Sequence, residues 1–335
     1  MKIGIAGCGI MGRLLGLELI NQGHEVSLFD KNNADTSNCS MAAAGMLAPI
    51  AELEKCGNII YEMGLKSLNE HWPRIIAELN ADIYFRQLGS LIVSHPKDES
   101  ELTNFISMLD SKVKTPVYQQ LSENEIAEME PGLSKFHRGY YLPTEGQLDN
   151  QALMQALQKT LIEKNVKWYW DTKIESMEDL DFDLVFDCRG LGANSHDDLQ
   201  AVRGELIWLH APDVTLNRPI RLMHPRYHLY VAPRPNNLFV VGASEIYAED
   251  YSEISVKTTL ELLTAIYYLH PGFAEARIIK TVTHCRPAFP DHLPKIKVTK
   301  NCVAINGLYR HGYLIAPTLV EEVMKYVKNA DHISE

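Results

Sequence analysis

The hydrophobic positions at the start of the chain predict a strand, a helix and a second strand. Residues 3–6 are short and apolar, which is typical of a strand buried on both faces of a parallel sheet. Apolar side chains then recur at helical spacing over residues 14–20, and Gly23 stands where a left-handed helix cap is expected. Residues 25–30 form the second strand-like stretch and end in an acid. The pattern therefore indicates a βαβ unit.

Three glycines follow the first of these strands in the order of a dinucleotide-binding turn. Gly7 permits the tight turn, Gly9 lets a pyrophosphate approach the backbone, and Gly12 lets the helix pack close to the strand. The helix N-terminus would supply N–H groups and a positive dipole end for the phosphates. Asp30 comes eighteen residues after Gly12 and is placed to accept hydrogen bonds from ribose hydroxyls. The alternative is a glycine-rich turn of an ordinary βαβ unit, but the complete order of elements favours a dinucleotide site.

The C-terminal end of the chain predicts a second strand, glycine turn and helix. Residues 303–306 are apolar, residues 307–312 have a glycine at each end, and the apolar positions of residues 319–327 have helical spacing. Residues 39–49 are a run of small side chains that would let the backbone approach a flat ligand, although alone they would suggest a helix start. A flavin dinucleotide needs two helix starts, one under the pyrophosphate and one near the pyrimidine edge of the ring. The two ends together favour FAD over NAD.

The middle of the chain mixes helical and strand-like patterns. Helical spacing appears over residues 65–79, where Pro73 interrupts it, and over residues 153–161. A turn at residues 235–237 predicts that the strands on either side of it pair antiparallel. Further strands are predicted at residues 83–93, 166–170, 184–186, 204–210, 229–231 and 238–241. This alternation predicts a compact chain of the α/β class (α+β overall) that crosses back and forth between two structural units.

Composition and charge narrow the class of protein. With 335 residues, 46% hydrophobic and 22% charged, the chain is long enough for two globular units. Its 32 Lys and Arg against 43 Asp and Glu give a formal charge of −11, which argues against nucleic acid or an anionic membrane as a partner. We expect no signal peptide and no membrane span, because no apolar run of about 18 residues is present. Six scattered cysteines suggest a cytoplasmic protein, and neither they nor the histidines show metal-binding spacing, so no metal is expected.

Several motifs spread over nearly the whole chain resemble, in the right order, those of the FAD-dependent glycine oxidases of thiamine biosynthesis, which belong to the D-amino-acid oxidase family. The motifs are residues 42–49 (AAAGMLAP), 187–193 (DCRGLGA), 202–205 (VRGE), 230–234 (YVAPR) and 285–291 (CRPAFPD), together with Arg310. The resemblance implies a Rossmann-like FAD-binding domain and a second substrate domain built on an antiparallel sheet. We expect the FAD-binding domain to comprise residues 1–82, 143–200 and 285–335, and the substrate domain residues 83–142 and 201–284.

The resemblance also implies an activity. Such enzymes oxidatively deaminate glycine and small amines, oxygen reoxidises the flavin, hydrogen peroxide is released, and the imine of glycine feeds thiazole synthesis. The implied partners are a small amino acid or amine and oxygen, with a homo-oligomer and a functional link to thiazole synthase as further expectations. Two alternatives stay open. One is a D-amino-acid dehydrogenase that passes electrons to another carrier, and the other is a flavin-binding redox partner or assembly factor without amine chemistry.

The family's substrate-binding residues fall on three positions of this chain. Its carboxylate-binding arginines correspond to Arg286 and Arg310, and its substrate tyrosine corresponds to Tyr230. Arginine suits the role because its guanidinium offers paired donors to a carboxylate. Without the resemblance, the two arginines would be interpreted as structural or surface residues and the tyrosine as part of the core. The expected FAD contacts are Gly7, Gly9, Ile10, Met11, Gly12, Asp30, Lys31, Ser40, Ala44, Gly45, Met46, Lys173, Gly190, Leu308, Tyr309, Arg310, His311, Gly312, Tyr313 and Leu314.

The chain departs from the family pattern at a few positions near the site. Leu308 stands where relatives often carry histidine, Met41 where a small residue is common, and residues 295–297 (KIK) where Tyr-Ile-Gly is usual. These differences concern rim contacts and substrate preference more than the reaction type. His311 is a candidate for tuning the charge of the flavin. Cys285 precedes the expected substrate arginine, but a small buried residue is the favoured interpretation, so we expect FAD to be bound noncovalently.

Overall fold

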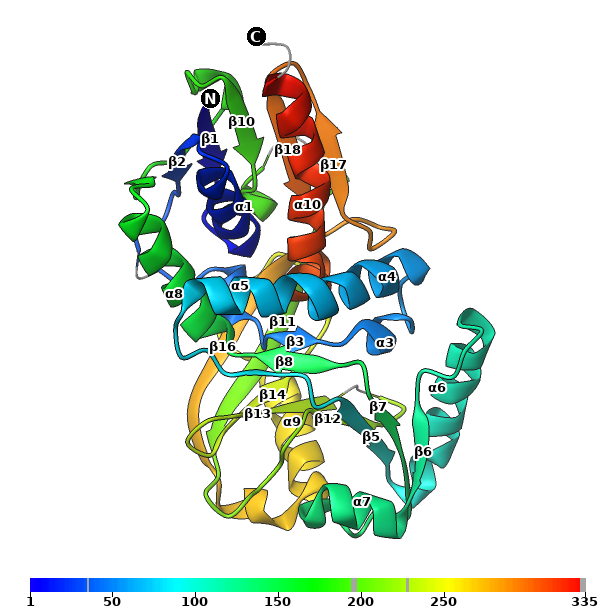
Figure 1. Cartoon of the computed structure of the whole chain (residues 1–335). Helices are drawn as coiled ribbons and strands as arrows, with labels where there is room; N and C mark the ends of the chain where they lie inside the picture. The colour runs from blue at the N-terminus through cyan, green and yellow to red at the C-terminus, as the bar shows by residue number, and fades with distance from the viewer. Residues whose placement is uncertain (35, 194–197, 227–228, 332–335) are drawn as a thin grey trace.

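The chain forms an upper and a lower part that share segments from its whole length. The computed structural model describes residues 1–34, 36–193, 198–226 and 229–331. Figure 1 shows a parallel sheet with its helices in the upper part and a larger sheet in the lower part. Blue, green and orange-red segments meet in the upper part, so residues far apart in the sequence build one sheet (Figure 1). The expected back-and-forth crossing of the chain is confirmed.

The parallel sheet holds the two strands that the ends of the chain predict. Its strands, in spatial order, are β17 (Lys295–Val298), β18 (Cys302–Asn306), β10 (Leu184–Asp187), β1 (Lys2–Ala6), β2 (Glu25–Phe29) and β9 (Lys167–Tyr169). Neighbours pair parallel except β17 and β18, which pair antiparallel. In β1, Ile3 lies between Leu184 and Val26 of the adjoining strands and is fully buried. Burial on both faces explains why this strand is uniformly apolar rather than alternating.

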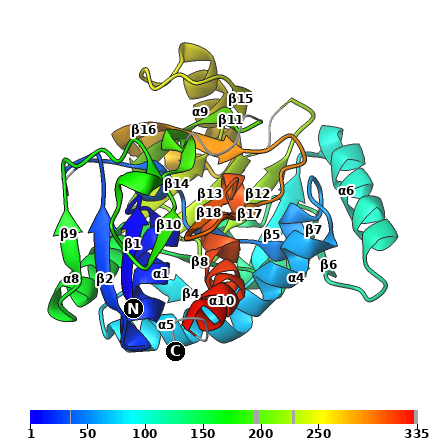
Figure 2. The ribbon, with the colours of Figure 1, turned by 90° about the horizontal axis from the view of Figure 1, so that it is seen from above.

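Three helices from distant parts of the chain pack together beside this sheet. They are α1 (Ile10–Asn21), α8 (Asn150–Glu163) and α10 (Gly312–Asp331), and α1 contacts both of the others. Their apolar stripes join the parallel sheet in one core, with Leu15, Leu157 and Ile315 fully buried. Figure 2 shows the sheet and these helices from above, with the first strand and helix between the segments from the middle and the end of the chain. The helices predicted from the apolar spacing of residues 14–20, 153–161 and 319–327 are therefore confirmed.

The helix predicted over residues 65–79 is part of a longer helical rod. The rod consists of α4 (Asn58–Lys66), a π-helical turn (Ser67–His71) and α5 (Trp72–Leu79), and it crosses between the two parts of the molecule in Figure 1. Pro73 lies in the first turn of α5, where a missing N–H costs no helical hydrogen bond. The predicted interruption is therefore present, but it takes the form of the π-helical turn before Pro73 and does not end the helical rod. The indole of Trp72 donates to the carbonyl of Tyr313 at 3.0 Å, which ties the rod to α10.

The larger sheet forms the lower part of the molecule and pairs its strands mostly antiparallel. In spatial order its strands are β15 (Ile246–Tyr247), β11 (Gln200–His210), β14 (Leu238–Gly242), β13 (Leu229–Arg234), β12 (Ile220–Met223), β5 (Ser90–Ser94), β7 (Arg138–Leu142) and β6 (Gln119–Ser122), with β16 (Arg277–Ala288) on the other edge of β11. The β12–β5 pair is parallel. Helices α6 (Glu99–Lys112), α7 (Glu123–Met129) and α9 (Val256–Leu269) surround it. The mixed α/β class and the antiparallel second sheet are confirmed.

A small third sheet connects the two parts. It contains β3 (Met46–Leu47), β8 (Gly146–Leu148) and β4 (Phe85–Arg86), and the short helices α2 (Cys39–Ala42) and α3 (Pro49–Glu52) flank β3. The prediction of one strand over residues 83–93 is wrong, because β4 and β5 belong to different sheets. Gly89 lies between them with φ +71° and turns the chain. A Cβ there would lie 2.3 Å from the ring of Tyr141, so the turn requires glycine.

The expected domain boundaries stay a prediction. The boundary after residue 82 falls between α5 and β4, and the boundary after residue 142 falls between β7 and β8, whereas the boundaries after residues 200 and 284 lie inside β11 and β16. Within the described ranges, no helix is both long and apolar enough to cross a membrane.

Candidate functional site

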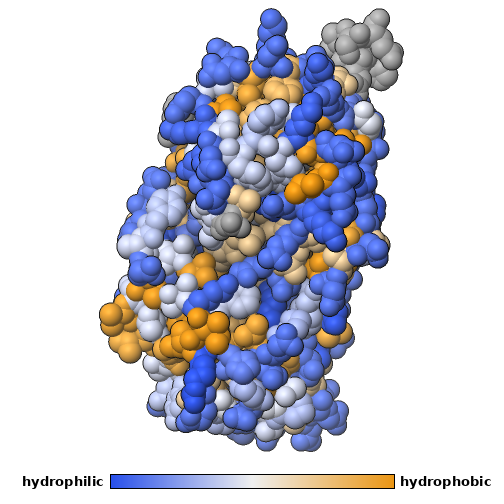
Figure 3. Space-filling view, turned by 90° about the vertical axis from the view of Figure 1, so that its left-hand side faces the viewer, coloured by the Kyte–Doolittle hydropathy of each residue, from blue (hydrophilic) through white to orange (hydrophobic). Residues whose placement is uncertain are grey.

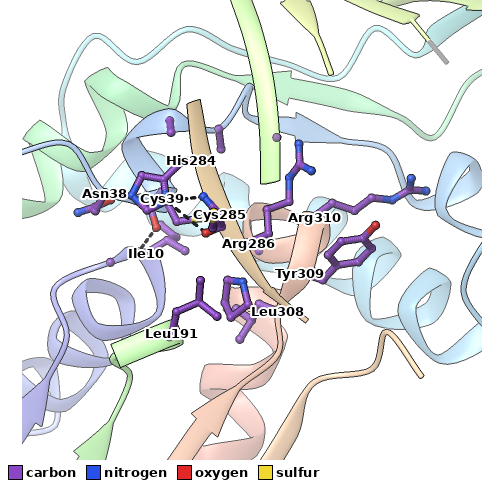
Figure 4. Close-up of a pocket in the computed structure, with 18 of the residues that line it drawn as sticks. Ile10, Asn38, Cys39, Leu191, His284, Cys285, Arg286, Leu308, Tyr309 and Arg310 are labelled. Carbon is purple, nitrogen blue, oxygen red and sulfur yellow. Dashed lines mark hydrogen bonds between the residues drawn. The ribbon is translucent and has the colours of Figure 1, made fainter. Parts of the chain in front are cut away.

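A cavity of about 840 Å³ lies between the parallel sheet and the larger sheet. Residues from both ends of the chain and from the middle line it, and its size is in the range of small-molecule and cofactor sites. Figure 4 shows Ile10, Asn38 and Cys39 at one end of the pocket and Tyr309 and Arg310 at the other. The cavity therefore joins the expected dinucleotide turn to the expected substrate residues.

The turn before α1 is shaped by close backbone contacts. Gly7 has φ +100°, and a Cβ on it would lie 2.4 Å from the carbonyl oxygen of Cys188. A Cβ on Gly12 would lie 2.0 Å from the carbonyl oxygen of Gly7. Gly9 is the N-cap residue of α1. Because glycine has no side chain, the cap residue leaves the N–H groups of the helix start uncovered. The helix start is thus a place where phosphate oxygens could bind.

Asp30 lies at the end of β2 and borders the same cavity. Its Oδ2 accepts the N–H of Cys8 at 2.8 Å, and its Oδ1 accepts the N–H of Asn32 at 2.9 Å. These two bonds hold the carboxylate beside the glycine turn. A carboxylate has about four lone-pair sites, so Asp30 can still accept bonds from ribose hydroxyls.

Ser40 links the two ends of the chain at the cavity. Its hydroxyl oxygen accepts the N–H of Ile10 at the start of α1 at 2.9 Å. Its carbonyl oxygen accepts the hydroxyl of Tyr313 in α10 at 2.9 Å and the side-chain amide of Asn150 at 2.9 Å. The two helix starts that the sequence predicts to share a ligand are therefore joined through a single residue. Asn150 is a contributor that the sequence interpretation missed.

The loop around Gly45 lies against a buried arginine. Gly45 has φ +64°, and a Cβ on it would lie 2.1 Å from the carbonyl oxygen of Leu148. Arg234 is 5% exposed and donates to the carbonyls of Ala44 and Leu148 and, at 2.8 Å, to the side chain of Gln147. Burial lowers the pKa of Arg234 to about 10, which leaves it protonated at neutral pH. Arg234 belongs to the YVAPR motif, but the sequence interpretation assigned it no role.

Two of the expected substrate residues have side chains that lie against glycines of neighbouring strands, where a larger residue would collide with them. Arg286 of β16 lies over Gly204, where a Cβ would be 2.1 Å from its Nη2. Tyr230 of β13 faces Gly242, where a Cβ would be 2.7 Å from its hydroxyl oxygen. Burial raises the pKa of Tyr230 and the charge of Arg286 opposes this shift, so the phenol keeps its proton and can donate it. Both side chains line the cavity.

Arg310 reaches the same end of the cavity but is already paired. Its Nε donates to Oε2 of Glu52 at 2.8 Å, and its Nη1 lies 3.6 Å from Oε2 of Glu245. Oε2 of Glu245 also accepts from Lys55 at 2.6 Å. Glu52, Lys55 and Glu245 line the cavity, and the sequence interpretation named none of them.

The expected contacts divide into a large group that borders the cavity and a small group that does not. Gly12, His311 and Leu314 are outside the cavity lining, whereas the other expected residues line it. Gly12 is closed off by the carbonyl of Gly7, and Leu314 is 1% exposed and packs on Gly64. His311 is 1% exposed and faces Glu52 and Cys56, so the structure does not support its expected place beside the ring.

Further residues line the cavity that the sequence interpretation did not name as contacts, although Cys39 lies in its run of small side chains and Leu191 in its motif at residues 187–193. They include Cys39, Leu191, Arg221, Ser244, Tyr251 and His284. The thiol of Cys285 donates to the carbonyl of Asp250 at 3.4 Å. Among the described residues, Glu52, Cys56 and His311 form a group whose possible metal-ligand atoms lie within 4.8 Å of one another, which their spacing in the sequence did not indicate.

The cavity fits a flat dinucleotide. Gly7, Gly12 and Gly45 leave no room for a side chain where backbone segments approach one another, and the N-cap residue of α1, Gly9, carries no side chain. Asp30 stands at the end of β2, where an acid binds ribose hydroxyls in dinucleotide-binding folds. The second turn, at residues 307–313, enters the same cavity from the other end of the chain. These features are those that FAD requires.

The protein resembles known enzymes over nearly all of its length. A Rhizobium etli protein that bears the name thiamine biosynthesis oxidoreductase ThiO is 34% identical over 327 residues, which cover 97% of this chain and 96% of that protein. A crystal structure of glycine oxidase from Geobacillus kaustophilus covers 98% of this chain and 95% of its own with a TM-score of 0.83 at 22% identity. The Bacillus cereus glycine oxidase structure covers 98% and 97% with a TM-score of 0.84 at 20% identity.

The family itself follows from a match over the whole molecule. Residues 2–324 match the DAO family, which is described as FAD dependent oxidoreductase. The match spans both sheets and both ends of the cavity, and it confirms the resemblance drawn from the motifs. The chain belongs to the DAO family of FAD-dependent oxidoreductases.

Proposed function

We propose that this protein oxidatively deaminates glycine and other small amino acids or amines, with oxygen as the electron acceptor. The observation that supports it most is Arg286, which lines the cavity beside Tyr230 and whose guanidinium has no carboxylate partner among the described residues. A positive group in this position suits the carboxylate of a small amino acid. The names of the relatives, a thiamine biosynthesis oxidoreductase and two glycine oxidases, point the same way.

The residues that would hold FAD are those around the two helix starts. The start of α1 would bind the pyrophosphate, and Asp30 would accept from the ribose. Ser40, Gly45 and the turn at residues 308–313 would enclose the ring. Bound FAD supplies the two-electron oxidation of the amine, and we propose that it is held noncovalently. The bond from the Cys285 thiol to Asp250 supports this, because the sulfur already has a partner within the protein.

The chain's own side chains would orient the amine. Arg286 would pair with the carboxylate, and the protonated phenol of Tyr230 would donate a second hydrogen bond to it. Arg310 adds positive charge at the same end, although its guanidinium pairs with Glu52. Holding the acid end in this way fixes the α-carbon over the reactive atoms, which is the positioning that accelerates such a reaction.

Glycine added to the purified yellow protein without oxygen is expected to bleach the main visible absorbance band of the flavin. In air, the same mixture should consume oxygen and release hydrogen peroxide. Bleaching without turnover in air would instead support the D-amino-acid dehydrogenase alternative. No bleaching with glycine, sarcosine or D-alanine would contradict amine oxidation altogether. We further propose that the imine of glycine supplies thiazole synthesis, which trapping of the imine by thiazole synthase would test.

Gly204→Ala is expected to weaken the binding of acetate, a minimal carboxylate, by about tenfold or more. The added Cβ would occupy the place of the Arg286 guanidinium, 2.1 Å from Nη2. Because that guanidinium is the end of a flexible side chain, it can move aside, and the thermal unfolding midpoint should hardly change. Gly192→Ala is the control, since its Cβ would lie 3.6 Å from the nearest atom. Calorimetric titration with acetate measures both variants, and equal affinities would contradict the placement of Arg286.

We also propose that the protein forms a homo-oligomer. Exposed apolar side chains occur on α9 and on the first part of β16, with Val256 77%, Leu260 61% and Ile279 54% exposed. Figure 3 shows one face of the molecule, on which orange residues gather mainly in the lower half, the half built on the larger sheet. Such surfaces are typical of contacts between subunits. Size-exclusion chromatography with light scattering tests this proposal.

A further inference from the structure

One helical turn holds the imidazole of His311 at both of its nitrogens. Glu52 is the last residue of α3, and its carbonyl oxygen accepts the N–H of Cys56 at 2.9 Å, so these two side chains lie on one face of the turn. Oε2 of Glu52 lies 2.9 Å from Nδ1 of His311, and Sγ of Cys56 lies 3.2 Å from Nε2. His311 and Cys56 are 1% and 3% exposed, and neither lines the cavity. The ring is therefore fixed behind the cavity wall.

The imidazole has one consistent arrangement of hydrogens. Burial, with the negative charge of Glu52, raises the pKa of Cys56 to about 12, so the thiol keeps its proton and can donate to Nε2 of His311. Nδ1 then carries the ring hydrogen, and Glu52 is its only polar neighbour within the described ranges. Burial alone would raise the pKa of Glu52, but Arg310 and His311 outweigh it and hold the pKa well below its usual range. Glu52 is therefore ionised and lies against the N–H side of the ring.

The same oxygen of Glu52 holds Arg310 by its inner nitrogen. Nε of Arg310 donates to Oε2 of Glu52 at 2.8 Å. Nη1 lies 3.6 Å from Oε2 of Glu245, which is beyond hydrogen-bond distance, and in the described part of the chain neither Nη group donates a hydrogen bond. The Arg310 side chain lines the cavity and is 22% exposed. The guanidinium is thus fixed on one side and keeps its two Nη groups for a ligand.

We propose that His311, held by Cys56, is a positioning residue that acts through Glu52 to present the Nη donors of Arg310 to the substrate carboxylate. One carboxylate oxygen contacts two consecutive residues, Arg310 and His311, so the turn at residues 309–311 is tied to the end of α3. Without His311, Glu52 and Arg310 could turn together, and the guanidinium would have to be ordered when the ligand binds. Fixing it beforehand removes that cost. The inference rests on the proposed function, because it takes the cavity as the site of a small amino acid.

Calorimetric titration of the holoprotein with acetate tests the proposal without turnover. In His311→Asn the side-chain amide can donate from the place of Nδ1, so acetate should bind within about threefold of wild type. His311→Leu has no donor for Glu52, and acetate should bind about tenfold more weakly. If His311→Leu does not fold, His311→Gln takes its place, because its longer amide reaches toward Cys56 instead of Glu52.

A double-mutant cycle shows whether the loss passes through Arg310. Arg310→Lys keeps the charge but removes Nε and the paired Nη donors. In this background, His311→Leu should weaken acetate binding by no more than about twofold, because the contact through which it acts is gone. A residue that only stabilises the fold would weaken binding by the same factor in both backgrounds, and that result would overturn the proposal.

Three further outcomes are decisive. Equal acetate affinities of the folded Asn and Leu variants would overturn the proposal. Stoichiometric zinc in the purified wild type would do the same, since a metal would then occupy Glu52, Cys56 and His311. Failure of wild type to bind acetate would overturn it together with the proposed function. Absence of glycine oxidation in a protein with the expected order of acetate affinities would count against the proposed function alone.

Discussion

Arg234→Met is expected to lower the free energy of unfolding by about 3–5 kcal/mol. The side chain is 5% exposed, and its guanidinium satisfies the carbonyls of Ala44 and Leu148 and the side-chain oxygen of Gln147. Methionine has a similar length but no donor, so these buried acceptors would lose their partners at about 1–3 kcal/mol each. The loop around Gly45 would loosen at the same time, so the FAD content of the purified variant should fall with its stability.

Urea unfolding of Arg234→Met beside Arg74→Met measures this effect. Arg74 is a half-exposed arginine that pairs with Glu18 at 3.2 Å on the surface, so its replacement should cost at most about 1 kcal/mol. Both substitutions remove one positive charge and introduce the same side chain. A similar small loss in both variants would show that Arg234 does not hold the loop, whatever its place in the motif.

Periodic segments were the part of the fold that could be predicted from the sequence. The βαβ unit at the start of the chain has a strand buried on both faces and a helix with an apolar stripe, and each leaves a pattern in consecutive residues. The larger sheet was predicted less completely, because many of its strands pair with segments that are distant in the sequence. Gly89 shows the difficulty, since a single turn separates two strands of different sheets within one apolar stretch.

The site was predictable where backbone shape selects the residue type. Gly7 and Gly12 mark close approaches that glycine alone allows, and the motif that contains them is a continuous run. Glu52 could not be found in this way, because its partner Arg310 lies 258 residues later in the chain. His311 was expected at the ring because it lies in the turn that was predicted to border the ring, but neighbouring side chains of a helical turn point in different directions. Contacts of this kind follow from the fold and leave no spacing in the sequence.

Gly12→Ala is expected to yield a protein with little or no FAD and with a free energy of unfolding lower by about 3 kcal/mol. The new Cβ would lie 2.0 Å from the carbonyl oxygen of Gly7, and neither atom is at the end of a flexible side chain. The helix must therefore move away from the strand, or the turn at Gly7 must open. Either change displaces the start of α1, whose N–H groups and positive dipole end would hold the pyrophosphate.

Gly16→Ala is the matched control one turn further along the same helix. Its Cβ would meet side-chain atoms of Leu161 and Leu28 at 3.7 Å, an ordinary contact distance. Alanine is also the better helix former by about 1 kcal/mol, so this variant should keep FAD and unfold at the same or a higher urea concentration. The ratio of flavin absorbance to protein absorbance and the unfolding midpoint are measured for both. If Gly12→Ala retained stoichiometric FAD, the close contact between Gly7 and Gly12 would not be needed for cofactor binding, and the pyrophosphate would have to be held elsewhere in the cavity.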